Sequence, residues 1–177
     1  MTLWTAGHGT ASQEEFGTLV RDARITRLVD IRTAPGSRRH PHFGGDALAE
    51  WLPSYGVAYA WERQLGGFRK PAPDSPDVVW RNDAFRGYAG WMRTPEFVAA
   101  LDDVLSSARA APTVVMCSES VWWRCHRRLV ADAVVLLRDM PVVHLMHDGR
   151  SVSHVPTDGV RVTDGGQLLY DAGQVAL

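Results

Sequence analysis

Residues 113–137 read TVVMCSESVWWRCHRRLVADAVVLL and contain both cysteines of the chain. The run 113–116 is apolar and β-branched, as in a buried strand, and apolar residues recur at helical spacing from 129 to 137. The stretch therefore predicts a strand, a polar turn and a helix. Ligands of open α/β sheets bind at the carboxyl ends of the strands. The thiol, carboxylate, imidazole and guanidinium groups of this turn thus stand where such a site would form.

Strands and helices alternate on both sides of this stretch. Apolar or β-branched runs predict five strands, at residues 3–6, 25–31, 57–60, 113–116 and 142–145. Helices are expected after a capping box formed by Ser12 and Glu15, and at residues 48–55, 84–92 and 95–109. The alternation predicts an α/β fold: a single, Rossmann-like three-layer α/β/α domain over residues 1–177, with a mostly parallel sheet of about five strands.

The last part of the chain has a hairpin signal. Asp148 and Gly149 lie between two short apolar runs, which favours a tight turn and an antiparallel edge strand. We therefore expect residues 146–177 to form an edge hairpin and a tail. The stretch 62–83, rich in proline and glycine, is expected to be a long connection, and such connections are usually functional or mobile.

Composition excludes some classes of protein. The 177 residues are 45% hydrophobic and 22% charged, with a formal net charge of -1, which argues against a broad cationic surface for nucleic acid. A secretion signal and an apolar run of membrane-spanning length are both absent from the sequence, so we expect a cytoplasmic protein with no membrane partner. In the cytoplasm, the two cysteines are expected to be free thiols or ligands.

Polar residues follow three of the predicted strands. Because the carboxyl ends of parallel strands meet at one edge of a sheet, these groups are expected to lie side by side. Glycines and arginines at such an edge favour an anionic small molecule, such as a nucleotide, as the partner. We predict four catalytic residues: His8, Asp30, Cys117 and Glu119. The predicted binding residues are Gly9, Thr10, Arg32, Ser37, Arg38, Arg39, Gly67, Trp123, Arg124, His126 and Arg127.

Two kinds of catalysis fit these residues. Cys117, at a strand end near arginines, would have a lowered pKa and a reactive thiolate, or would be a core residue that ends the strand. Asp30 and Glu119 are carboxylates at the ends of strands, suited to attack on a glycosidic bond, although Asp30 is equally suited to a structural ion pair. Trp122 and Trp123 offer a stacking wall or simple packing.

A cofactor is not expected. The third glycine of a dinucleotide fingerprint is missing after Gly9. A metal site built from Cys117, Cys125 and His126, with His8 or Glu119 as a further ligand, is an alternative. Against it, seven residues separate the two cysteines, and adjacent residues of a helix do not readily face one ion. Cys125 is also suited to simple burial in the helix.

Several short motifs occur in a defined order: Gly7-His8-Gly9-Thr10, Leu28-Val29-Asp30-Ile31-Arg32 with Pro35 and Ser37-Arg38-Arg39, Leu65-Gly66-Gly67, Tyr88-Ala89, and Met116-Cys117-Ser118-Glu119 with Arg124-Cys125-His126-Arg127-Arg128. This set, spread over residues 3 to about 145, resembles the domain of unknown function 488 family. The resemblance implies a compact α/β domain from the cytoplasm of a bacterium or archaeon, and it implies no particular reaction. Alanine is expected in many relatives where this chain has Ser118.

These features together predict an enzyme. Its substrate would be a phosphate-bearing small molecule, such as a nucleotide or a nucleic-acid component, and its reaction hydrolysis or transfer at a glycosidic or phosphoester bond. A binding module without turnover would use the same pocket and is the main alternative. A metal-dependent Cys/His site is the second alternative.

Overall fold

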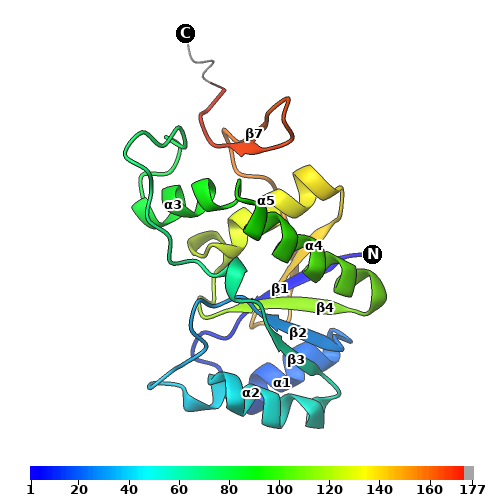
Figure 1. The fold of residues 1–177 in the computed structure, drawn as a ribbon. Coiled ribbons are helices and arrows are strands. Elements are labelled where there is room, and N and C mark those ends of the chain that lie inside the picture. Colours follow the sequence, from blue (N-terminus) through cyan, green and yellow to red (C-terminus); the bar gives the residue numbers. More distant parts are fainter. Residues whose placement is uncertain (174–177) are drawn as a thin grey trace.

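The computed structural model describes residues 1–173 of the chain (Figure 1). Six strands form one sheet in the order β3-β2-β4-β1-β5-β6. Neighbouring strands are parallel except at the last pair, where β6 runs antiparallel to β5. The strands are β1 (Leu3–Gly7), β2 (Arg27–Asp30), β3 (Ala58–Trp61), β4 (Thr113–Cys117), β5 (Val142–Leu145) and β6 (Ser151–Ser153).

Helices cover both faces of this sheet. One face carries α1 (Gln13–Asp22) and α2 (Gly45–Trp51). The other carries α3 (Asp83–Trp91), α4 (Pro95–Ala110) and α5 (Arg127–Arg138), as Figure 1 shows above and below the strands. The three-layer α/β/α class predicted from the alternation of elements is confirmed.

The strand β4 lies inside the sheet and is buried along its whole length. Val115 and Cys117 belong to the core beneath α4 and α5, whereas Val114 and Met116 belong to the core beneath α1 and α2. A strand covered on both faces needs apolar side chains in both directions, which explains its continuous apolar sequence. The alternation also directs the thiol of Cys117 toward the α5 side of the sheet.

Most helices and strands lie at the predicted positions, although their first and last residues differ from the prediction. The capping box is present: the Ser12 hydroxyl accepts from the Glu15 N–H over 3.1 Å, and the Glu15 carboxylate accepts from the Ser12 N–H over 2.7 Å. The strand predicted at 25–31 is shorter, Arg27–Asp30. The helix predicted at 48–55 divides into α2 and a 3-10 turn, Leu52–Tyr55, because Pro53 lacks the N–H that an α-helix needs there.

The order of the strands determines which loops meet. Because β4 lies between β2 and β1, the carboxyl ends of these three strands are adjacent, with Gly7 beside Cys117 and Asp30 beside Met116. This confirms that the three polar strand ends lie side by side. The order differs from that of the dinucleotide-binding doubly wound fold, in which the first two strands are neighbours.

The carboxyl-terminal part packs against α5. The predicted hairpin is present as β5 and β6, and a second, two-stranded sheet pairs β7 (Arg161–Val162) with β8 (Leu168–Leu169). The buried carboxylate of Asp132, on α5, accepts hydrogen bonds from three side chains of this part: His154, Thr157 and Tyr170. Within residues 1–173, none of the helices has the length and apolar character needed to cross a membrane.

Candidate functional site

A cavity of about 550 Å³ opens at the carboxyl edge of the sheet. The ends of the three adjacent strands supply His8, Arg32 and Cys117 to its wall. The long connection after β3 supplies Gly67 and Phe68, and the start of α3 closes one side. The cavity therefore lies where the fold brings together the segments that the sequence marked as polar.

Arg32 is anchored in the wall by a buried carboxylate. Its Nε donates to Asp30 Oδ1 over 2.9 Å, and its Nη2 donates to the second Asp30 oxygen and to the carbonyl of Phe43. Asp30 is completely buried, and Arg32 is 7% exposed. The pair fixes the guanidinium plane, so that Nη1 is the part of Arg32 turned toward His8 and the cavity.

His8 is a neutral imidazole at neutral pH. Burial, followed by the charge of Arg32, lowers its pKa from 6.5 to about 4. Its Nε2 lies 3.4 Å from Arg32 Nη1, which only donates, so Nε2 is the acceptor and Nδ1–H donates to the Gly9 carbonyl over 3.0 Å. The ring also stacks on Phe43 at 4.2 Å. His8 can therefore accept a proton or hydrogen bond at Nε2, and it is not an acid at pH 7.

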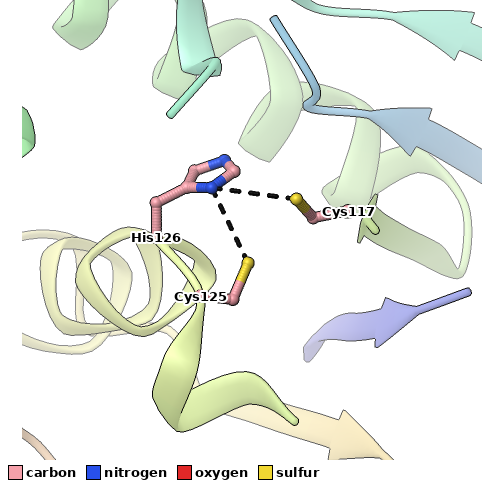
Figure 2. A group of neighbouring side chains, drawn as sticks. All are labelled: Cys117, Cys125 and His126. Carbon is pink, nitrogen blue, oxygen red and sulfur yellow. Dashed lines mark hydrogen bonds between the residues drawn. The ribbon is translucent and has the colours of Figure 1, made fainter. Parts of the chain in front are cut away.

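The floor of the cavity is a cluster of two thiols and an imidazole (Figure 2). The Nδ1 atom of His126 lies 3.8 Å from Cys117 Sγ and 3.6 Å from Cys125 Sγ. All three side chains are at least nine-tenths buried. In Figure 2 the two sulfurs approach the same nitrogen from β4 and from the segment before α5.

The backbone before α5 explains how two adjacent residues face one point. Cys125 is extended, with φ -125° and ψ 151°, and it follows a 3-10 turn, Trp122–Arg124. His126 is the helix cap, and α5 begins only at Arg127. The expectation that Cys125 lies within the helix is therefore wrong. Because the two residues lack consecutive helical geometry, the argument that they cannot share a ligand fails.

The two thiols differ in acidity. The hydrogen bond with Cys125, together with burial, raises the pKa of the Cys117 thiol well above its usual value. Burial opposes ionisation of Cys125, but the hydrogen bond from Cys117, the contact with His126 and the charge of Arg127 outweigh it and hold the pKa of Cys125 well below its usual value. The predicted lowered pKa of Cys117 is therefore wrong, and Cys125 is the thiol of the pair whose pKa is lowered.

The rim of the cavity is polar and accessible. Its lining includes polar side chains that are partly or fully exposed, among them Ser37, Arg39, His40, Ser118, Glu119 and Arg124. Three arginines, counting Arg32, thus line the same space. Among residues 1–173, Glu119 is the one carboxylate in the lining. The excess of guanidinium groups gives the rim a positive character.

Ten of the expected site residues line the cavity: His8, Gly9, Arg32, Ser37, Arg39, Gly67, Cys117, Glu119, Arg124 and His126. The other five, all within the described residues, are Thr10, Asp30, Arg38, Trp123 and Arg127, which lie outside the lining. Asp30 sits behind Arg32, and Arg38 is an exposed residue of the loop after β2. Thr10 lines a separate, smaller pocket beside Glu15.

Arg127 points away from the cavity. It is 1% exposed, with Nη1 donating to the hydroxyl of Thr5 over 3.3 Å and Nη2 donating to the carbonyl of Glu119. Its hydrogen bond to the Glu119 carbonyl therefore stabilises the loop that carries Glu119. Trp123 is 46% exposed and packs edge to face against Trp122, which stacks on the buried ring of His144.

Sequence reasoning left some lining residues out of the predicted site. Cys125, His40, Ser118 and Phe68 all line the cavity. Cys125 was expected to be packing or, in the alternative, a metal ligand. His40 directly follows the Ser37-Arg38-Arg39 motif, and Phe68 directly follows Gly67, so proximity in the chain was the one available signal.

Comparison with known proteins supports one assignment. Neither the curated proteins nor the solved structures contain a match to this chain. A family model, described as Domain of unknown function DUF488, matches residues 12–134, which is more than half of the chain. The match includes the two cysteines and His126, whereas His8 lies before it. The chain with this Cys/His floor and arginine rim therefore belongs to the DUF488 family.

Proposed function

We propose that the cavity binds a phosphate-bearing small molecule, such as a nucleotide, and that the protein is an enzyme acting on it. The observation that carries this proposal is the charge of the lining, in which Arg32, Arg39 and Arg124 stand against a single carboxylate, Glu119. Guanidinium groups bind phosphate oxygens through charge-assisted, often bidentate hydrogen bonds. Arg32 is the anchored member, and Arg39 and Arg124 are exposed and can turn toward a ligand.

The size and apolar parts of the cavity fit such a ligand. A volume of about 550 Å³ lies in the range of small-molecule sites. Phe68 and Phe85 line the same cavity, and Phe68 is 85% exposed. An aromatic face of this kind stacks on a base or a sugar while the arginines hold the phosphate.

The catalytic groups would come from the floor. Cys125, His126 and the neutral ring of His8 line the same cavity and can act as nucleophile or base, and the lowered pKa of Cys125 favours it as the nucleophile. Asp30 has a different task in this proposal, because both of its oxygens are engaged by Arg32. The reaction would be hydrolysis or transfer at a phosphoester or glycosidic bond.

Calorimetry with inorganic phosphate and AMP tests the binding step. We expect Arg124→Ala to weaken AMP binding by about 10- to 100-fold if its contact is a charge-assisted hydrogen bond. Arg109→Ala is the matched control, since Arg109 is exposed at the end of α4 and lines a different pocket, among residues such as Met1 and Pro112. Equal affinity of wild type and Arg124→Ala would contradict the anion pocket.

Turnover needs a separate measurement. The protein, in excess over radiolabelled nucleotides and short oligonucleotides, should convert one of them in a single turnover, and Cys125→Ser should abolish the conversion. Tight nucleotide binding with every substrate returned intact would instead identify a binding module that uses the same pocket.

A further inference from the structure

The structure assigns a further role to the floor of the cavity: we propose that Cys117, Cys125 and His126 bind one thiophilic divalent cation of the zinc class, with the fourth coordination position open to the cavity. The inference does not rest on the anion proposal, because it concerns three buried side chains beneath the arginine rim. When the ion is bound, Cys125 and His126 are its ligands, so a Lewis acid in reach of a bound anion would take the place of the free thiol as the catalytic group.

The distances match those of a tetrahedral centre. With Zn–S of about 2.3 Å and Zn–N of about 2.0 Å, a sulfur and a nitrogen ligand of tetrahedral zinc lie about 3.5 Å apart. The observed separations from His126 Nδ1 are 3.6 Å to Cys125 Sγ and 3.8 Å to Cys117 Sγ. The three ligand atoms all lie within 4.8 Å of one another. An ion can therefore contact all three with little movement of the side chains.

The imidazole of His126 is oriented for a ligand at Nδ1. Its Nε2 lies 3.2 Å from the carbonyl of Ile31, which only accepts, so Nε2 carries the proton and Nδ1 presents its lone pair to the two sulfurs. A histidine that binds a metal typically donates its other N–H to a carbonyl or carboxylate. Tyr88 packs at 5.0 Å from the ring, and Gly67 lies against it. The ring is thus held from several sides in this orientation.

Charge and burial also favour a cation here. A buried thiolate pair needs a compensating positive charge, and a divalent ion supplies it. On binding, the thiols release their protons to solvent and two metal–sulfur bonds form.

The set of ligands indicates the kind of site. Structural zinc centres are closed by four protein ligands, whereas catalytic ones use three, Cys₂His among them, and leave one position for water or substrate. Here all three residues line the cavity together with the arginines of its rim. A water or a phosphate oxygen can therefore fill the fourth position.

Metal analysis tests this inference directly. Protein incubated with Zn²⁺ under reducing conditions and then desalted should hold about one ion per chain, and the Cys117→Ser, Cys125→Ser and His126→Gln variants should each lose most of it. His147→Gln is the control, because His147 is exposed and lies outside the trio. Retention of stoichiometric zinc by two or more of the three variants would overturn the assignment.

Cobalt spectroscopy covers the case in which a variant fails to fold. Wild-type protein titrated with Co²⁺ should develop intense near-ultraviolet thiolate-to-cobalt absorption and visible bands of tetrahedral cobalt, saturating at one equivalent. Absence of these bands, or a Cys117–Cys125 disulfide formed in place of metal binding under reducing conditions, would refute the site. Arg124→Ala should keep full cobalt binding even if it loses AMP, so the failure of one proposal is distinguishable from the failure of the other.

Discussion

The carboxylate of Asp30 is bound on both oxygens by the guanidinium of Arg32, in an ion pair at the centre of the cavity wall. The hydroxyl of Tyr59 also donates to Asp30, over 3.2 Å, and burial, then the charge of Asp30, raises the pKa of that tyrosine. Asp30, predicted from the sequence to be catalytic, and Arg32, predicted to bind the ligand, therefore form one buried ion pair. Asp30 sets the position of Arg32, and Arg32 in turn holds the neutral ring of His8.

Removal of Asp30 should destabilise the protein strongly. Asp30→Ala leaves the Arg32 charge buried and unpaired, which costs about 3 to 5 kcal/mol in the free energy of unfolding. Asp22→Ala is the control, because Asp22 pairs with Arg21 on the surface, where such pairs contribute about 1 kcal/mol or less. Urea denaturation at pH 7 measures both variants. Equal stability of the two would show that the buried pair is unimportant.

The sequence predicts the framework of this site well and its side-chain geometry poorly. Apolar runs and a capping box are local signals, so the strands and α1 could be placed from the sequence. The alternation of strands and helices then predicted a parallel sheet with three polar strand ends at one edge. The direction of a long side chain depends on its tertiary neighbours. Arg127 stands in a basic run, yet it is buried because Thr5 and the Glu119 carbonyl accept its hydrogen bonds.

The break before α5 shows the same limit. Apolar spacing after residue 128 predicts the helix, but it carries no signal for the extended conformation of Cys125. That one residue decides whether the second thiol packs in the helix or joins the floor of the cavity. Both outcomes are compatible with a buried cysteine, so composition and spacing alone could not separate them.

Gly67 should tolerate no side chain. A Cβ at this position would lie 2.6 Å from His126 Nδ1, closer than atoms pack. Gly67→Ala should therefore displace the imidazole and lower the stability by about 1 to 3 kcal/mol. Gly36→Ala is a matched control in the same cavity, because a Cβ there meets nothing within 4 Å. Thermal unfolding would contradict this reading if both variants melted at the wild-type temperature.

Glu119 should affect ligand binding more than folding. Its side chain is exposed on the rim, so Glu119→Gln should change the free energy of unfolding by about 0.5 kcal/mol or less. Because the substitution removes the one negative charge among the described lining residues, phosphate and AMP should bind several-fold more tightly. Glu50→Gln, exposed on α2, should leave the affinity unchanged. Weaker binding by Glu119→Gln would show instead that this carboxylate contacts the ligand as an acceptor.

A chain of buried hydrogen bonds runs beneath the site toward the carboxyl-terminal part. Arg127 donates to the hydroxyl of Thr5, which lies 2.7 Å from Nδ1 of His144. Nε2 of His144 lies 3.0 Å from Nδ1 of His154, whose Nε2 lies 2.8 Å from Asp132. Every acceptor in this chain is matched when both histidines are neutral and donate toward Asp132. A proton added to Nδ1 of His144 would remove the acceptor of the Thr5 hydroxyl hydrogen and leave that hydroxyl oxygen to accept from both His144 and Arg127.

Acid should therefore destabilise the fold through His144. Burial, followed by the charges of His154 and Arg127, lowers the pKa of His144 from 6.5 to about 3. Below about pH 6.5 the unfolded chain protonates this ring while the folded protein does not, so stability falls as the pH drops toward about 3, by about 1.4 kcal/mol per pH unit for this group. His8, with a pKa of about 4, acts in the same direction.

Urea denaturation of wild type and His144→Gln at pH 7, 6 and 5 tests this dependence. The quantity compared is the change in the free energy of unfolding per pH unit, so a difference in stability between the two proteins at pH 7 does not affect the result. The variant should lose stability less steeply with acid by up to about 1.4 kcal/mol per pH unit. NMR of the wild-type protein gives a second measure, in which the ring protons of His144 should show no titration between pH 7 and 5. Two results would contradict this account: a His144 ring that titrates near its ordinary pKa, or an equal dependence of the free energy of unfolding on pH in the two proteins. Either would mean that His144 is charged in the folded state at acid pH and that the hydrogen-bond chain runs in a different direction.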